Sequence, residues 1–210
     1  MKENLLGPRS EARPAPARTA AAADQFPWIV AVNGSTQCSG IRIADQEVAT
    51  VRHCGSVFGV FGGARARFEP LFLNPRVRPQ SHASLDFQIA ALSTTVPHQP
   101  APPLLTDAEL EACGCRPLRA IGFGRAGRDR ELSYGEVHLV RARCTGSSNV
   151  DYACTDAEFV TTDLVNGALV PGDSGGAILA TDGSRWYLAG MILRRHNATN
   201  HVVHLRLPLR

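Results

Sequence analysis

Short runs of β-branched and aromatic residues recur along the chain and predict strands. Residues 26–32 form one such run, Asn33-Gly34 favours a hairpin turn, and a second run follows over 36–43. In residues 86–94 apolar side chains recur at positions 87, 89 and 91, as in a half-buried strand. The pattern favours an all-β fold, with further strands predicted over 47–51, 57–61, 64–68 and 202–207.

Three segments depart from this pattern. Residues 1–23 are rich in Ala, Pro and Arg without apolar periodicity, so we expect a flexible leader. They hold no apolar stretch long enough for a clear signal peptide. The Pro-rich run over 95–103 is expected to link two halves of the fold. Thr106 with Glu109 has the capping-box pattern and predicts a short helix to Ala112.

Composition limits the classes of partner. At 210 residues, with 44% hydrophobic residues, 14 prolines and 19 glycines, the chain suits one compact unit of two small β-barrels. The formal net charge is only +3, and most of it falls in the leader. We therefore expect no nucleic-acid partner and no membrane partner, since no apolar stretch is long enough to cross a bilayer.

The candidate chemistry begins at Gly172-Asp173-Ser174-Gly175-Gly176. A serine on a glycine-rich turn suits a nucleophile, and the N–H groups of Gly172 and Ser174 could hold a developing oxyanion. The alternative is an ordinary glycine-rich hairpin turn, because Gly, Ser and Asp are common turn residues.

A serine nucleophile needs a base, and the base needs an orienting carboxylate. His53 follows the predicted strand at 47–51, and Asp86 opens the strand at 86–94. The order along the chain is His53, Asp86, Ser174.

This order, with these three local contexts, resembles the trypsin/chymotrypsin family of serine proteases. Further matches are Cys38-Ser39-Gly40, the turn Ile121-Gly122-Phe123-Gly124 and the strand at 188–193, which resembles the wall of the family's substrate cleft. The resemblance covers roughly residues 26–207. It implies two six-stranded antiparallel β-barrels with the active site in the cleft between them, within a protease domain over 24–210. The first barrel is expected over about 26–95 and the second over about 116–207.

The resemblance also implies a function. Ser174 would attack a peptide bond, His53 would act as the base, and Asp86 would orient His53. We therefore expect a serine endopeptidase that acts on protein or peptide substrates, as a monomer and without a cofactor. The alternative is a catalytically inactive homologue that acts as a binding protein.

The family's cysteine directly after the catalytic histidine is bridged to the Cys-x-Gly strand, which here implies Cys38–Cys54. Residues 136–140 resemble the strand leading to another family cysteine, so Cys144–Cys154 is the next pair. These two pairs fit an oxidising compartment, and we expect a secreted or periplasmic protein. Cys113-Gly114-Cys115 matches no family bridge. With His53, His82 or His98 it could form a metal-binding structural module, although the Cys-x-x-Cys form is absent and we expect no metal.

The chain departs from the family upstream of the first barrel. Nothing in residues 13–25 resembles the Ile-Val-Gly-Gly start whose freed amine pairs with the acid before the nucleophile, here Asp173. Either another group satisfies Asp173, which we favour, or the pocket is disordered.

Specificity is the second departure. The residue six before the nucleophile, an aspartate where Arg or Lys is selected, is here Ala168, and Leu169 follows. The cleft strand ends Leu193-Arg194-Arg195, where Arg195 could obstruct the pocket or face an acidic substrate side chain. Alternatively both arginines point to solvent. We expect only that cleavage after Arg or Lys is not favoured.

Three histidines follow the cleft strand. His196, His201 and His204 could form a pocket cluster, as in relatives that cleave after Glu. We favour the interpretation that they are polar surface residues.

Overall fold

We describe the fold from a computed structural model of the chain. It describes residues 19–20, 25–33, 36–55, 58–61, 64–70, 86–92, 101–112, 117–124, 132–145, 152, 154–165, 167–196 and 198–207. Cys113, Cys115, His82, His98 and the greater part of the Pro-rich run lie outside the described residues.

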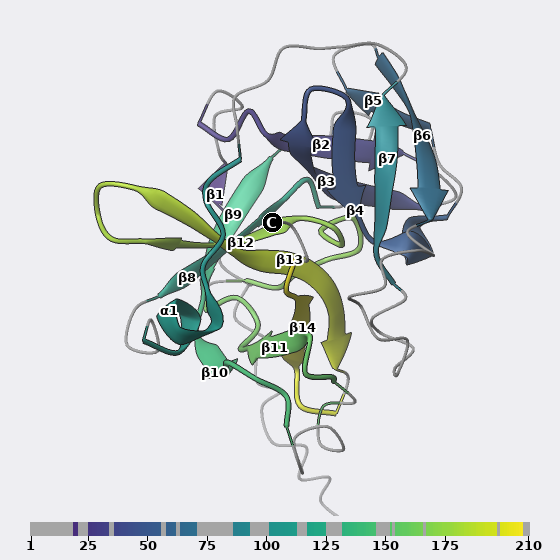
Figure 1. Cartoon of the computed structure of the whole chain (residues 1–210). Coiled ribbons are helices and arrows are strands. Elements are labelled where there is room, and N and C mark those ends of the chain that lie inside the picture. Colours follow the sequence, from purple (N-terminus) through teal and green to yellow (C-terminus); the bar gives the residue numbers. More distant parts are fainter. Residues whose placement is uncertain are drawn as a thin grey trace, which may run out of the picture.

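The first half of the chain forms a closed antiparallel barrel in the strand order β2-β3-β4-β7-β6-β5 (Figure 1). The predicted pairing of 26–32 with 36–43 is present, since β2 pairs with β3, and β5 pairs with β6 in the same way. Closure comes from β2, which also pairs with β5. The strands are β2 (Ile29–Asn33), β3 (Gln37–Ala44), β4 (Glu47–Thr50), β5 (Phe58–Phe61), β6 (Ala64–Pro70) and β7 (Gln88–Leu92).

The second half is one antiparallel sheet in the order β1-β9-β8-β12-β13-β14-β11-β10. Only His138 separates β9 from β10, yet β9 pairs with β8 and β10 pairs with β11. The sheet therefore curls round on itself. The strands are β1 (Thr19–Ala20), β8 (Leu118–Gly122), β9 (Ser133–Val137), β10 (Leu139–Arg141), β11 (Glu158–Thr161), β12 (Ala177–Thr181), β13 (Trp186–His196) and β14 (His201–Leu205).

The all-β, trypsin-like fold class predicted from the sequence is confirmed. The first barrel has the six strands expected, whereas the described residues of the second half form a curled sheet of eight strands, because the short strand β1 adds to its edge and β10 to its other end. The expected leader contains one short strand, because β1 pairs with Ser133–Tyr134 at the edge of the second sheet. Among the described residues no helix has the length and apolar character needed to span a membrane.

The predicted short helix is present as α1 (Asp107–Ala112). Its start is a capping box: the Glu109 carboxylate accepts from the backbone N–H of Thr106, and the Thr106 hydroxyl accepts from the N–H of Glu109. Leu110 is the buried residue of this helix and packs on the core of the second sheet.

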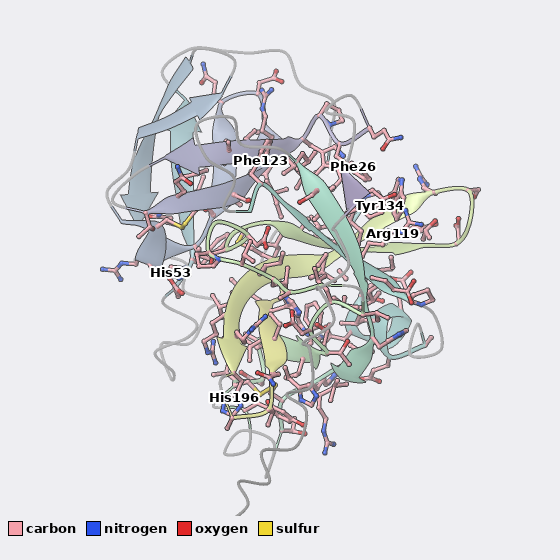
Figure 2. All side chains as sticks on the ribbon, turned by 180° about the vertical axis from the view of Figure 1, so that it is seen from behind. Phe26, His53, Arg119, Phe123, Tyr134 and His196 are labelled. Carbon is pink, nitrogen blue, oxygen red and sulfur yellow. A yellow bond between two sulfur atoms is a disulfide. The ribbon has the colours of Figure 1, made fainter. Side chains whose placement is uncertain are left out.

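One apolar core joins the two halves. Trp28 and Val48 of the first barrel belong to the same buried cluster as Met191 and Leu193 of β13. Beside it, the Phe26 ring packs against Tyr134 at 6.4 Å, and the Arg119 guanidinium lies 5.1 Å from the Tyr134 ring centre (Figure 2). Burying a large apolar side chain contributes about 1.5–3 kcal/mol. This shared core therefore holds the first barrel against the second sheet.

Candidate active site

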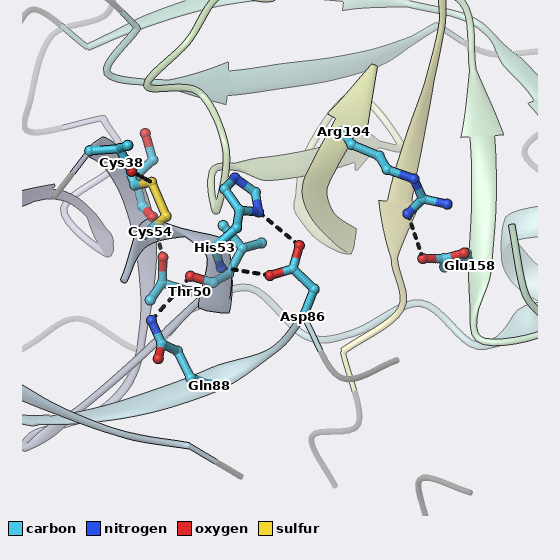
Figure 3. A network of polar contacts seen from close by, with 11 residues as sticks. Cys38, Thr50, His53, Cys54, Asp86, Gln88, Glu158 and Arg194 are labelled. Carbon is cyan, nitrogen blue, oxygen red and sulfur yellow. Dashed lines mark hydrogen bonds and ion pairs between the residues drawn. A yellow bond between two sulfur atoms is a disulfide. The ribbon is translucent and has the colours of Figure 1, made fainter. Parts of the chain in front are cut away.

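His53 and Asp86 form a hydrogen-bonded pair (Figure 3). The Nδ1 atom of His53 lies 2.7 Å from Oδ2 of Asp86, and the backbone N–H of His53 donates to Oδ1 at 2.7 Å. One carboxylate therefore holds both the ring and the backbone of the same histidine. The His53 side chain is 44% exposed and that of Asp86 24%, so the ring remains open to a ligand.

Strand pairing in the first barrel produces this contact. β4 and β7 are antiparallel neighbours with Thr50 opposite Gln88, so the end of β4 lies beside the start of β7. The chain then turns through a short 3₁₀ helix, Arg52–Cys54, which carries His53. The Gln88 amide donates to the carbonyl of Val51 at 3.1 Å and fixes the entry to that turn.

Ser174 lies on the loop between β11 and β12, and backbone hydrogen bonds within the loop close it. Asp173 N–H donates to Val170 O at 3.1 Å, and Gly176 N–H donates to Asp173 O at 2.8 Å. Gly172 has φ of 105° and Gly175 has φ of 82°, which only glycine adopts without strain.

Two donors of this loop stay open. Asp173, Gly175 and Gly176 donate their N–H groups to backbone carbonyls. Within the part of the chain that the structure describes, the N–H groups of Gly172 and Ser174 have no acceptor. This pair of open donors next to a serine hydroxyl can bind an anionic oxygen.

Asp173, the acid before Ser174, is only 1% exposed. Its Oδ1 accepts from the N–H of Gly124 at 3.0 Å and its Oδ2 accepts from the N–H of Val170 at 2.8 Å. The expectation that another group satisfies Asp173 in place of a freed amine agrees with these contacts. The buried carboxylate ties the nucleophile loop to the predicted 121–124 turn.

The loop of Ser174 is also tied to the barrel that carries His53. The N–H of Ser39 donates to the carbonyl of Ser174 at 2.8 Å. Cys38, next to Ser39, is disulfide-bonded to Cys54, next to His53. Among the described contacts the Ser174 hydroxyl has no hydrogen bond to His53; such bonds often tighten only when substrate is bound.

The predicted pocket residues Ala168, Leu169, Leu193 and Arg195 fall on two segments, the loop before Ser174 and the strand β13. Ala168 and Leu169 are half-buried, and Leu193 is fully buried.

Both arginines of the cleft strand are partly exposed and also form ion pairs within the chain. Arg195 forms an ion pair with Asp163 and donates to Leu169 O at 3.2 Å. Arg194 donates to the buried carboxylate of Glu158 at 3.0 Å (Figure 3). Both positive charges are therefore neutralised within the chain.

Asp163, which the sequence did not single out, anchors the loop of two predicted pocket residues. Its Oδ1 accepts from the N–H of Leu164 at 2.9 Å and of Leu169 at 3.0 Å, while Oδ2 meets Arg195. It thus anchors the loop that carries Ala168 and Leu169. An aspartate beginning a Gly-containing loop is a turn signal, and that signal could have drawn attention to it.

The three histidines behave differently from one another. His204 is fully buried, so the surface interpretation is wrong for it. Its Nε2 lies 2.8 Å from the Thr161 hydroxyl, and burial lowers its pKa to about 3. His196 contacts Thr199 at 3.0 Å, and Tyr152 packs against His196 and His201.

Both predicted disulfides, Cys38–Cys54 and Cys144–Cys154, are present. Of the described residues that could bind a metal ion, His53, Cys38 and Cys54 bring their ligand atoms within 4.8 Å of one another. Because the two sulfur atoms are bonded to each other, they offer no thiolate, and the group does not suit a zinc site.

The family model described as Trypsin matches residues 17–201, which is most of the chain. No curated protein matches the chain in sequence.

Proposed function

This chain belongs to the trypsin family, and from that premise we propose that it is a serine endopeptidase. The observation that carries the proposal is the pair of open N–H donors at Gly172 and Ser174. They accompany a histidine whose Nδ1 is already bonded to the Asp86 carboxylate. A serine, an oriented imidazole and an anion cradle are the groups that acyl transfer requires.

The proposed mechanism assigns one task to each group. The Ser174 hydroxyl attacks a peptide carbonyl while Nε2 of His53 takes the hydroxyl proton. Asp86 holds the Nδ1–H tautomer and stabilises the imidazolium. The N–H groups of Gly172 and Ser174 bind the oxyanion, and the protonated His53 then gives its proton to the leaving amine. Water hydrolyses the acyl-enzyme with His53 again as base.

The hydrogen bonds that the Asp173 carboxylate accepts concern whether the Ser174 loop needs a freed N-terminal amine. The carboxylate accepts from Gly124 and Val170, both backbone donors close to the loop itself. We therefore propose that the loop needs no freed amine. The two disulfides are consistent with an extracellular protein, and we propose that it is secreted and cleaves proteins or peptides without a cofactor.

A fluorophosphonate probe tests the function, because only a working serine nucleophile reacts with it. We expect rapid labelling of the wild-type chain at Ser174 and none in the Ser174→Ala variant. Turnover of peptides should fall by several orders of magnitude in Ser174→Ala and in His53→Ala, with no further loss in the double variant.

An unlabelled wild-type chain would instead favour the alternative, an inactive homologue that binds its partner. Retention of most peptidase activity by Ser174→Ala would show that the nucleophile lies elsewhere.

A further inference from the structure

We propose that Ser39, a buried residue of the first barrel, positions the loop 172–174 for catalysis. The inference rests on the proposed function, because it concerns the N–H donors that would bind the oxyanion. Ser39 touches neither the substrate nor the reacting atoms, so its role is that of a positioning residue.

Every polar atom of Ser39 is hydrogen-bonded, and the hydroxyl and the N–H reach the second half of the chain. Its hydroxyl donates to the carbonyl of Gly172 at 2.8 Å and accepts from the N–H of Phe123 at 2.9 Å. Its N–H donates to Ser174 O at 2.8 Å, and its carbonyl accepts from the Thr50 hydroxyl at 2.7 Å. The residue is 0% exposed, so water does not compete for these bonds.

The Ser39 hydroxyl holds the peptide group between Gly172 and Asp173. The Gly172–Asp173 peptide lies between the two peptides that carry the open N–H groups of Gly172 and Ser174. It is held at one end by the Ser39 hydroxyl and at the other by Val170 O, which accepts from Asp173 N–H at 3.1 Å. Because Gly172 has φ of 105° and no side chain, it offers little resistance to rotation of this peptide. The Ser39 hydroxyl supplies that resistance.

The loop packs tightly against Ser39. A Cβ on Gly175 would lie 2.1 Å from Ser39 O, and a Cβ on Gly122 would lie 3.1 Å from the Ser39 hydroxyl oxygen. The same Gly122 Cβ would lie 2.8 Å from Oδ1 of Asp173. The loop therefore rests directly on the strand of Ser39, and the two supports, Ser39 and Asp173, lie side by side.

The Ser39→Ala variant of the full chain tests this role with a fluorophosphonate probe. In the labelling reaction the Ser174 oxygen bonds to phosphorus, fluoride leaves and the hydroxyl proton passes to His53. The phosphoryl oxygen takes the place of the oxyanion, so the maximal labelling rate reports the loop. Loss of one oxyanion donor costs about 10²–10³-fold, and for a residue acting through that donor we expect a fall of about tenfold or more. The probe concentration that gives half-maximal rate should change little.

Thr50→Val is the matched control. It removes one equally buried hydrogen bond to Ser39, but one that does not reach the Gly172–Asp173 peptide. We expect Thr50→Val to lower the melting temperature about as much as Ser39→Ala while it keeps most of the labelling rate. If Ser39→Ala does not fold, Ser39→Gly removes the same hydroxyl and takes its place.

The labelling rates distinguish the role of Ser39 from the proposed function. Slow labelling of the Ser39 variant beside a fast Thr50→Val chain supports the role. Equal rates for Ser39→Ala and wild type, or equal losses in Ser39→Ala and Thr50→Val, overturn it and leave the proposed function standing. A wild-type chain that does not label overturns the proposed function and the role of Ser39 together.

Discussion

At the level of single residues, we expect the ion pair of Arg195 to affect substrate choice. Asp163 pairs with this guanidinium and also accepts the N–H groups of Leu164 and Leu169. An acidic substrate side chain would therefore have to displace an existing carboxylate. Beside this neutralised pair, the proposed pocket residues Ala168 and Leu193 are uncharged, so we expect a preference for apolar side chains over Glu, Arg or Lys.

The Asp163→Asn variant should change that preference. An asparagine oxygen can still accept from the loop N–H groups, but it carries no charge to neutralise Arg195. Since a partly exposed ion pair contributes up to about 1 kcal/mol, the Glu-to-Leu ratio of kcat/KM should rise about threefold to fivefold. The measurement uses matched chromogenic peptides with Arg, Leu and Glu before the scissile bond. The double variant Asp163→Asn, Arg195→Gln should lose the gain, and an unchanged ratio in Asp163→Asn would contradict the interpretation.

His204 makes stability depend on pH. Burial beside Phe159 and Thr161 lowers the pKa of His204 to about 3, well below the usual value near 6.5. Between these two values the unfolded chain takes up a proton that the folded chain does not. The contribution of the neutral, buried His204 to the free energy of unfolding is therefore complete above about pH 6.5. It is lost as the pH falls toward 3, at up to about 1.4 kcal/mol per pH unit.

Melting temperatures measured from pH 7.5 to pH 4 check this. His204→Gln keeps a group that can bond to Thr161 but does not titrate, so its curve should be flatter than that of the wild type. Parallel curves for the two proteins would show that His204 does not cause the slope.

At the level of elements, the capping box of α1 gives a local test. Hydrogen bonds from the backbone and hydroxyl of Thr106 lower the pKa of Glu109. This stabilisation is present above the ordinary pKa of a glutamate and is lost as the pH falls below it. Thr106→Ala should lower the melting temperature by a few degrees at pH 7. The difference from wild type should narrow near pH 3, and a constant difference would mean that the carboxylate takes no part.

The elements show which features a sequence can reveal. The capping box, the hairpin at Asn33-Gly34 and the context of Ser174 depend on neighbours within a few residues, and they were predictable for that reason. The role of Ser39 was not, because its hydroxyl bonds to Gly172, which lies 133 residues along the chain. The turn at Asp163 has a local signal, but its ion pair with Arg195 spans 32 residues and has none. His204 was missed as a buried residue because a lone polar residue on a terminal strand gives no sign of which face it occupies.

At the level of the whole molecule, the two barrels must hold the two halves of the site against each other. His53 and Asp86 come from the first barrel, while Ser174 and its open N–H donors come from the loop that precedes β12. The Cys38–Cys54 disulfide lies at this junction, since Cys38 precedes Ser39 and Cys54 follows His53. Cys144–Cys154 joins two residues of the second half, far along the chain from both His53 and Asp86.

This difference in position predicts a difference in function between two similar crosslinks. The disulfides close loops with sequence separations of 16 and 10, so removing either one by double Cys→Ala substitution should cost roughly 3 kcal/mol of stability. Only loss of Cys38–Cys54 should also slow fluorophosphonate labelling in the folded protein, because it frees the strand of Ser39 and the turn of His53 together. Denaturant unfolding and labelling rates, both measured well below the melting temperature, separate the two effects. Unchanged labelling in both variants would mean that the crosslinks act on stability alone, and that the shared apolar core around Trp28 and Met191 holds the first barrel against the second sheet. Equal slowing in both variants would contradict a special role for Cys38–Cys54.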